Sequence, residues 1–263
     1  MINTAFENYY TEIYGSRWEA LRKSLVEERP ACAFSSGLTV PYFLDYASVL
    51  AARSLRLPDC ETRMDSQPIT VLDACAAPGG KSLVIAAALP AGALLLCNEV
   101  SSERRRRLSD VLDRHLDKDK RARARVCGFD AAAQGRRKSE HGRFDAILLD
   151  APCSGEAHVL KNDHALREWT AARPRFLARR QWALLSSAFL LLKPGGCLVY
   201  STCSVNPAEN DGVTRRLPEK YGGCLELDPP DFTEGERSAY GKMLLPDMCN
   251  CGPLYVARFR KTQ

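Results

Sequence analysis

The sequence comprises 263 residues with a formal net charge of +5; 45% of the residues are hydrophobic and 26% are charged. This balance is that of a globular protein, and the length suits one large domain with an appendage. No apolar run is long enough to cross a bilayer, and the N-terminus lacks the apolar core of a secretory signal. We therefore expect a soluble cytoplasmic protein with no membrane association, and the mitochondrial matrix is the second choice.

The first 68 residues show a mainly helical pattern. It runs through "AFENYYTEIYGSRWEALRKSLVEE", breaks at Pro30 and resumes in "YFLDYASVLAARSL". From residue 69 the pattern changes, because short apolar runs rich in β-formers alternate with helical stretches. We expect strands at residues 69–75, 93–99, 124–128, 144–150 and 197–201, and helices at residues 81–89, 101–116 and 175–192.

Continuously apolar strands that alternate with helices are typical of a parallel sheet covered on both faces. The tail adds two candidate strands, "CLELD" and "PLYVARFRK", with no obvious helix between them. We expect these two to form an antiparallel edge. The sequence therefore predicts an α/β fold with a mostly parallel seven-stranded sheet, preceded by a small helical segment.

Ligands of such sheets bind beyond the carboxyl ends of the strands. The first strand ends in "VLDACAAPGGKS", where a Pro-Gly-Gly turn permits close approach of a ligand and leads into a helix N-terminus. The turn matches neither the dinucleotide fingerprint nor the P-loop. Taken alone it is weak, and a purely structural turn is a fair alternative.

Carboxylates end the next three strands: Glu99, Asp130 and Asp150. One such carboxylate is usually a surface cap. Three of them beside a glycine turn predict an adenosine-type ligand, whose hydroxyls and exocyclic amine need acceptors. NAD and S-adenosylmethionine both carry that group, but the pyrophosphate fingerprint that NAD requires is absent.

Two of the eleven cysteines also follow strand ends. Cys153 lies in "LLDAPCSG" after the fourth strand, and Cys203 lies in "YSTCSVNPAEN" after the fifth. Adjacent strands would bring both thiols to one crevice, where a thiolate is a strong nucleophile. The remaining cysteines are interpreted as small core residues. Cys249 and Cys251 have no second Cys/His pair to complete a zinc site, so we expect no metal.

The motifs "DACAAPGGKS", "DAPCSGE", "LLKPGG" and "YSTCSVNPAEN" resemble the RNA cytosine-5 methyltransferases of the RsmB/NOP/Sun family. The resemblance extends from Tyr42 to the C-terminus and is closest to bacterial ribosomal RNA members. It implies a Rossmann-like class I methyltransferase domain over residues 69–263. Residues 1–68 are then a candidate RNA-contacting segment.

The resemblance also implies the cofactor, S-adenosylmethionine, and the roles of both thiols. Cys203 would be the nucleophile, and Cys153 would help to release the product. Asp150, beside the base, would hydrogen-bond the N3 edge of the cytosine and favour its protonation as charge develops. The implied cofactor contacts are Cys75, Ala76, Ala77, Pro78, Gly79, Gly80, Lys81, Glu99, Arg104, Asp130 and Asp150.

The chain departs from the family pattern at three places. Ala157 and His158 replace a glycine and an apolar residue, and "SSER" lacks a proline after its first serine. These changes bear on substrate positioning rather than on the chemistry. We assign no role to His158.

Positive charge is concentrated between residues 104 and 143, in "RRRR" and "KDKRARAR". This density fits a polyanionic partner, and a solvated helix face is an equal alternative. We expect residues 114–138 to contact RNA phosphates if the first interpretation holds. The expected partner is ribosomal RNA or a ribosomal particle, with transfer RNA as the alternative. A protein partner could aid specificity, and the chain is expected to be a monomer.

Three other functions stay open at this point. A DNA cytosine-5 methyltransferase would use the thiol after proline, Cys153, as its nucleophile. A ribosome-assembly factor could keep the fold without the activity, although the two thiols, Asp150 and the glycine turn disfavour it. An NAD oxidoreductase is a distant third.

Overall fold

The computed structural model describes residues 3–57 and 68–263. The α-helices are α1 (Thr4–Tyr14), α2 (Trp18–Val26), α3 (Tyr46–Arg53), α4 (Gly80–Ala87), α5 (Ser102–His115), α6 (Lys118–Arg123), α7 (Ala131–Gln134), α8 (Glu156–Lys161), α9 (Asp163–Arg167), α10 (Ala172–Leu191), α11 (Asp211–Thr214) and α12 (Arg216–Tyr221). Short 3-10 turns are η1 (Gly15–Arg17), η3 (Lys138–Glu140) and η4 (Gly222–Cys224).

The strands are β1 (Cys32–Phe34), β2 (Tyr42–Leu44), β3 (Thr70–Asp73), β4 (Leu94–Asn98), β5 (Ala124–Cys127), β6 (Phe144–Asp150), β7 (Leu192–Thr202), β8 (Leu225–Leu227), β9 (Glu236–Arg237), β10 (Lys242–Leu244) and β11 (Leu254–Lys261).

The central sheet has the order β5-β4-β3-β6-β7-β11-β10-β9, and β8 pairs with β11. Strands β3 to β7 are parallel, whereas β11 is antiparallel to β7. The expected parallel core and antiparallel edge are confirmed. The expected number of strands is corrected, because nine strands of residues 3–57 and 68–263 form the sheet where seven were predicted. The additional strands, β9 and β10, have two and three residues, too short to show alternating hydrophobicity.

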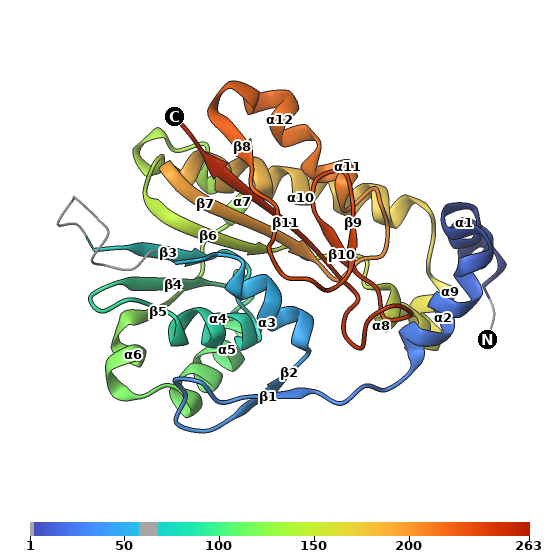
Figure 1. Cartoon of the computed structure of the whole chain (residues 1–263), viewed down its shortest axis with the longest axis horizontal. Coiled ribbons are helices and arrows are strands. Elements are labelled where there is room, and N and C mark those ends of the chain that lie inside the picture. The colour runs from blue at the N-terminus through green and yellow to red at the C-terminus, as the bar shows by residue number, and fades with distance from the viewer. Residues whose placement is uncertain (1–2, 58–67) are drawn as a thin grey trace.

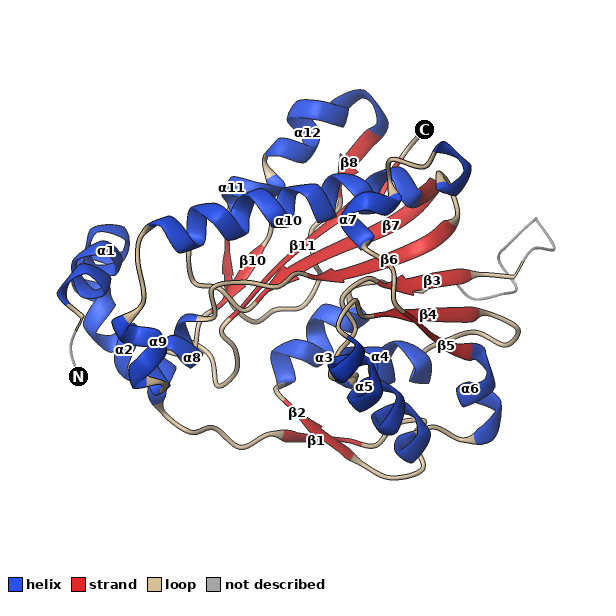
Figure 2. Ribbon diagram, turned by 180° about the vertical axis from the view of Figure 1, so that it is seen from behind, coloured by secondary structure: helices blue, strands red, loops and turns tan. Residues whose placement is uncertain are grey.

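Helices cover both faces of the sheet (Figure 1). One face packs against α3, α4 and α5, and the other packs against α7, α10, α11 and α12 (Figure 2). Local sequence explains where these helices begin. Helix α5 starts after Ser101, whose hydroxyl accepts the Arg104 N–H, and α3 starts after Asp45, whose carboxylate accepts the Ala47 N–H.

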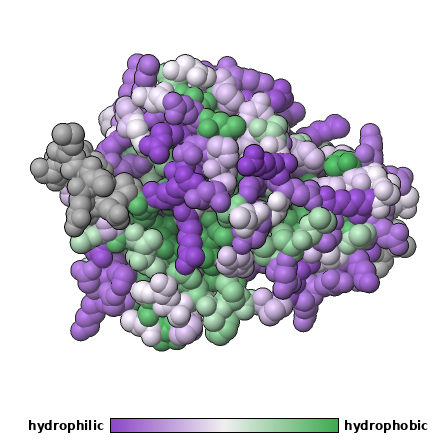
Figure 3. Space-filling view, viewed as in Figure 1, coloured by the Kyte–Doolittle hydropathy of each residue, from purple (hydrophilic) through white to green (hydrophobic). Residues whose placement is uncertain are grey.

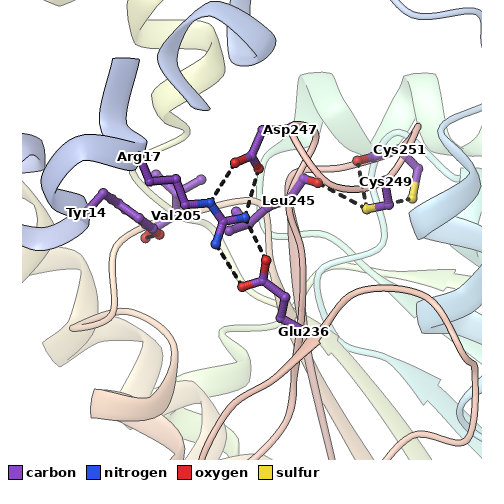
Figure 4. A network of polar contacts seen from close by, with 8 residues as sticks. All are labelled: Tyr14, Arg17, Val205, Glu236, Leu245, Asp247, Cys249 and Cys251. Atoms are coloured by element: carbon purple, nitrogen blue, oxygen red, sulfur yellow. Dashed lines mark hydrogen bonds and ion pairs between the residues drawn. The ribbon is translucent and has the colours of Figure 1, made fainter. Parts of the chain in front are cut away.

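The N-terminal segment is helical in part. Helices α1 and α2 pack against α8 and α9 through a third apolar core that includes Phe6, Trp18 and Trp169. Figure 4 shows Arg17 between Asp247 and Glu236. The ion pairs, at 2.6 and 2.7 Å, tie this segment to the loop after β10 and to strand β9.

The predicted helix "YFLDYASVLAARSL" is wrong at its start. Residues Tyr42–Leu44 are strand β2, which pairs with β1 in a two-stranded antiparallel sheet. The helix begins only where the carboxylate of Asp45 caps it.

No helix in residues 3–57 or 68–263 is both long and apolar enough to cross a membrane. On the face seen in Figure 3, hydrophilic residues predominate in the upper part, with some hydrophobic residues among them. Hydrophobic residues gather lower down, around α3 and α4. These two helices supply much of the larger apolar core, including Val49, Leu50, Leu83 and Ile85.

Candidate cofactor and catalytic site

The carboxyl ends of β3, β4, β6 and β7 surround a cavity of about 510 Å³. That volume lies within the range of small-molecule sites. Of the residues expected at the site, it is lined by Cys75, Ala77, Glu99, Arg104, Asp130, Asp150, Cys153 and Cys203. The structure therefore brings the three strand-end carboxylates and both thiols to one crevice.

Most of the other residues of the glycine turn line a second cavity. A neighbouring cavity of about 240 Å³ is lined by Ala76, Pro78, Gly80, Lys81, Asp150, Asp73 and the strand β2. Gly79 lines neither cavity. Cys75, Ala77 and Asp150 line both cavities, so the turn forms the wall between them.

The two glycines of the turn are needed for packing against protein. Gly79 has φ of 120°, and a β-carbon there would lie 3.0 Å from Cγ1 of Val111 on α5. A β-carbon at Gly80 would lie 3.0 Å from the ring of Tyr42 on β2. The turn is thus held between α5 and the small two-stranded sheet.

Glu99 is 3% exposed and is fixed from two sides. One carboxylate oxygen accepts the Ser101 N–H at 2.9 Å, and the other pairs with Arg104 at 3.1 Å. Arg104 also donates to the carbonyl of Ala77 at 2.8 Å, so it links the glycine turn to the second strand. A carboxylate has about four acceptor sites, which leaves Glu99 able to accept ligand hydroxyls.

Asp130 caps α7 by accepting the Ala132 N–H at 3.0 Å, and it also lines the larger cavity. Asp130 therefore both caps a helix and lines the cavity. Between these two carboxylates lies Asn98, which sequence reasoning missed. Its amide nitrogen donates to the carbonyls of Ala74 and Phe129, both at 3.0 Å, and fixes the neighbouring loops. The sequence feature that could have identified Asn98 is its position as a polar residue directly before Glu99.

The two thiols are in contact. The Sγ atoms of Cys153 and Cys203 lie 2.6 Å apart, and Cys203 is the more exposed of the two. The hydrogen bond to Cys203, together with burial and the charges of Glu156 and Glu209, raises the pKa of the Cys153 thiol well above its usual value. The raised pKa favours the protonated form of Cys153, and either thiol can be the donor in the contact between them.

Asp150 is held by two donors. Its Oδ2 accepts Lys81 Nζ at 2.7 Å, and its Oδ1 accepts the Ser201 hydroxyl at 2.7 Å. Burial acts to lower the pKa of Lys81, but the charge and hydrogen bond of Asp150 outweigh it and raise the pKa overall. Lys81 thus remains an ammonium beside the carboxylate.

The carboxyl group of Asp73 lies near the pair formed by Lys81 and Asp150. Asp73 is fully buried, and burial raises its pKa to about 7. Its Oδ2 accepts the Ser82 hydroxyl at 2.6 Å, while its Oδ1 has no partner among the described residues. The unpaired oxygen belongs to a residue that lines the smaller cavity.

The departures from the family pattern lie to one side of the crevice. His158 is exposed on α8 and lines neither cavity, and Ala157 packs on the core beneath α1 and α2. Ser102, where the proline is missing, is the first residue of α5, and Ser101 before it caps the helix. Arg180 and Leu184 of α10, by contrast, line the larger cavity. Sequence reasoning missed both, because a helix residue that reaches a distant strand end carries no local signal.

A sequence model of the family described as 16S rRNA methyltransferase RsmB/F matches residues 64–260. Ribosomal RNA small subunit methyltransferase F of Enterobacter sp. (strain 638) is 39% identical over 203 residues, which are 75% of this chain and 41% of that protein. The protein of the same name from Aeromonas salmonicida (strain A449) is 38% identical over 225 residues, 84% of this chain and 45% of that protein. The chain thus spans less than half the length of these relatives.

Solved structures agree. The crystal structure of NSun6 from Pyrococcus horikoshii with SFG has a TM-score of 0.68 and 25% identity, covering 88% of this chain and 55% of that chain. A methyltransferase homolog from Pyrococcus horikoshii has a TM-score of 0.74 at 23% identity, covers 99% and 95% of the two chains, and shows the fold. The chain belongs to the 16S rRNA methyltransferase RsmB/F family, whose methyl donor is S-adenosylmethionine.

Proposed function

We propose that the chain methylates carbon 5 of a cytosine in ribosomal RNA through a covalent thiolate adduct at carbon 6. One observation carries the proposal. The thiols of Cys153 and Cys203 lie 2.6 Å apart in the cavity that also contains Glu99, Asp130 and Asp150. Carbon 5 of cytosine is a poor nucleophile, and a thiolate added to carbon 6 makes it enamine-like.

The two thiols then have different tasks. The Cys203 thiolate forms the bond to carbon 6, and carbon 5 takes the methyl group. The adduct then loses the proton from carbon 5 to water, and the electron pair left behind restores the 5,6 double bond as the bond between carbon 6 and Cys203 breaks and Cys203 leaves as a thiolate. Cys153 assists that elimination. The raised pKa of Cys153 supports this division, because a protonated thiol is a poor nucleophile.

Asp150 acts on the base. As Cys203 adds and negative charge develops on N3, Asp150 favours the protonation of N3, and its carboxylate accepts the resulting N3–H hydrogen bond. Lys81 and Ser201, both at 2.7 Å, are positioning residues that fix the orientation of this carboxylate.

S-adenosylmethionine supplies the methyl group as a sulfonium. We propose that Glu99 and Asp130 accept its hydroxyl and amine protons, with Cys75, Ala77 and Arg104 beside them in the larger cavity. Ala76, Pro78, Gly79, Gly80 and Lys81 would act by shaping and holding the turn.

Removal of either carboxylate should weaken cofactor binding. Glu99→Ala and Asp130→Ala each delete an acceptor for a buried polar group, which costs on the order of 1–3 kcal/mol. Titration calorimetry with S-adenosylmethionine measures this directly. Glu103→Ala, an exposed carboxylate on α5, is the matched control. Unchanged affinity in both cavity variants would contradict the assignment.

The substrate is proposed from the names of the curated relatives, and transfer RNA is the alternative. An assembled ribosomal particle or a protein partner would aid specificity. Residues 1–68 would add a further contact with the RNA. The proposed location of the protein is the cytoplasm. Bisulfite sequencing of total RNA with and without the gene tests this. We expect one ribosomal cytosine to lose its methyl group; loss at a transfer RNA position would favour the alternative, and no loss would contradict the activity.

A further inference from the structure

The first half of α10 presents a basic, aromatic surface. Arg173, Arg179 and Arg180 surround Phe176 at spacings of three or four residues, so the four side chains lie on one side of the helix. The arginines are exposed, and Phe176 is 65% exposed. We call these four residues the arginine face. The second half of the helix is different, because Leu185, Ala188 and Phe189 are buried in the core.

The guanidinium groups of the arginine face are unpaired. None of the three forms a hydrogen bond or ion pair through its side chain with any residue among 3–57 and 68–263. The sequence also has no Asp or Glu between Glu168 and Glu209. The positive charge of this surface is therefore uncompensated.

In the basic segment between residues 104 and 143, several basic side chains form ion pairs. Arg121 pairs with Asp113 at 2.6 Å, Arg123 with Asp119 at 2.8 Å, and Lys120 with Asp117 at 2.7 Å. Arg104 is bound to Glu99. Part of that charge is therefore neutralised by acidic partners, whereas Arg106, Arg114 and Lys118 form no ion pair with the described residues.

The arginine face leads into the catalytic crevice. Arg180 lines the same cavity as Cys153 and Cys203, and Leu184, one turn further, lines it too. Behind them Gln181 donates to the carbonyl of Pro152 at 3.0 Å, which clamps α10 to the loop that carries Cys153. Figure 2 shows α10 lying along β6 and β7, with its first turns extending toward the end of the sheet that carries α8.

We propose that the arginine face binds the single-stranded RNA that flanks the target cytosine, with guanidinium groups on phosphates and Phe176 stacked on a base. This rests on the proposed function. A target base must leave its stack to reach the crevice, so its neighbours are unpaired and available for stacking. Arginines match phosphate geometry, and an aromatic ring among them is the usual platform of single-strand binding.

The test measures RNA binding, not methylation. The probe is a fluorescein-labelled oligocytidylate of about 20 nucleotides, followed by anisotropy over a series of salt concentrations. Arg173→Gln with Arg179→Gln should weaken binding roughly tenfold and reduce the salt slope by about 1.4, the value for two lost phosphate contacts. Phe176→Ala should weaken binding about tenfold with an unchanged slope, because stacking releases no counterions.

The matched control is Arg107→Gln with Arg215→Gln. It removes the same charge from exposed arginines that pair with Glu103 and Glu219. If the control variant bound the oligonucleotide as weakly as the Arg173→Gln/Arg179→Gln variant, net charge alone would set the affinity, and the proposal would be overturned. The proposal would also be overturned if Phe176→Ala and the Arg173→Gln/Arg179→Gln variant both bound the oligonucleotide with the affinity of the wild type.

Failure of the proposed function would look different, because the wild type itself would then not bind the oligonucleotide. S-adenosylmethionine affinity, measured by calorimetry, should be the same in all these variants and the wild type. That result separates a lost RNA contact from a disturbed fold.

Discussion

Cys203→Ala is expected to abolish both methyl transfer and covalent attachment to RNA, whereas Cys153→Ala should accumulate a protein–RNA conjugate. The thiols are 2.6 Å apart, so each substitution removes one member of a contacting pair. Without Cys203 no bond to carbon 6 can form. Without Cys153 the adduct still forms and carbon 5 is still methylated, but elimination stalls.

The conjugate survives denaturation, so a denaturing gel run under reducing conditions resolves it as a retarded band that requires S-adenosylmethionine. Cys224→Ala is the matched control, since this half-buried thiol lies in η4 and lines neither cavity. It should behave like the wild type.

The same gel separates the other functions. The DNA-type mechanism predicts the reverse pattern, with the conjugate present in Cys203→Ala and absent from Cys153→Ala. An assembly factor without activity predicts no conjugate in any lane. A conjugate in Cys203→Ala would therefore overturn the assignment of the nucleophile.

Much of this site followed from strand order. Once the runs that end at Asp150 and Ser201 are taken as parallel neighbours, their carboxyl ends must meet, and Cys153 and Cys203 with them. Strands β6 and β7 are indeed hydrogen-bonded neighbours. Likewise Glu99 and Asp130, which follow β4 and β5, reach the same cavity.

The parts that sequence reasoning missed depend on tertiary contacts. Strand β2 looked helical because its three residues precede a true helix without a break, and only pairing with β1 reveals it. Arg180 reaches the crevice because Gln181 anchors α10 to Pro152, a contact between residues far apart in the sequence. Charge density alone also does not show which basic residues are paired, since it counts Arg121 and Arg123 without their acidic partners.

A buried carboxyl pair beneath the two cysteine loops gives the second large effect. Glu156 and Glu209 are both 0% exposed. The hydroxyls of Ser154 and Ser204, the residues that follow the two cysteines, each contact both carboxyl groups. Glu209 also accepts the Ser154 N–H at 3.0 Å and the amide of Gln181 at 2.7 Å.

We expect the two carboxyl groups to share one proton. Two hydroxyl protons cannot serve four contacts between serines and carboxyl oxygens, and a proton on Glu209 supplies another donor. Burial and the charge of Glu156 raise the pKa of Glu209, in agreement. A carboxyl whose pKa is raised on folding contributes most to stability at acid pH. That contribution is lost as pH rises from the usual Glu value through the raised one.

We therefore expect Glu209→Ala to cost about 3 kcal/mol of unfolding free energy, because it leaves the Ser154 N–H and one N–H of the Gln181 amide unpaired. Glu209→Gln carries a permanent proton on its amide and should keep the network. Urea denaturation at pH 5 and pH 8 measures both.

The sign with pH is fixed by the raised pKa. Relative to the wild type, Glu209→Gln should be more stable at pH 8 than it is at pH 5, since the wild type must ionise a buried carboxyl at the higher pH and the amide cannot. An equal loss in Glu209→Gln and Glu209→Ala at both pH values would show that Glu209 is ionised in the fold. The shared-proton network that joins the Cys153 and Cys203 loops would then be wrong.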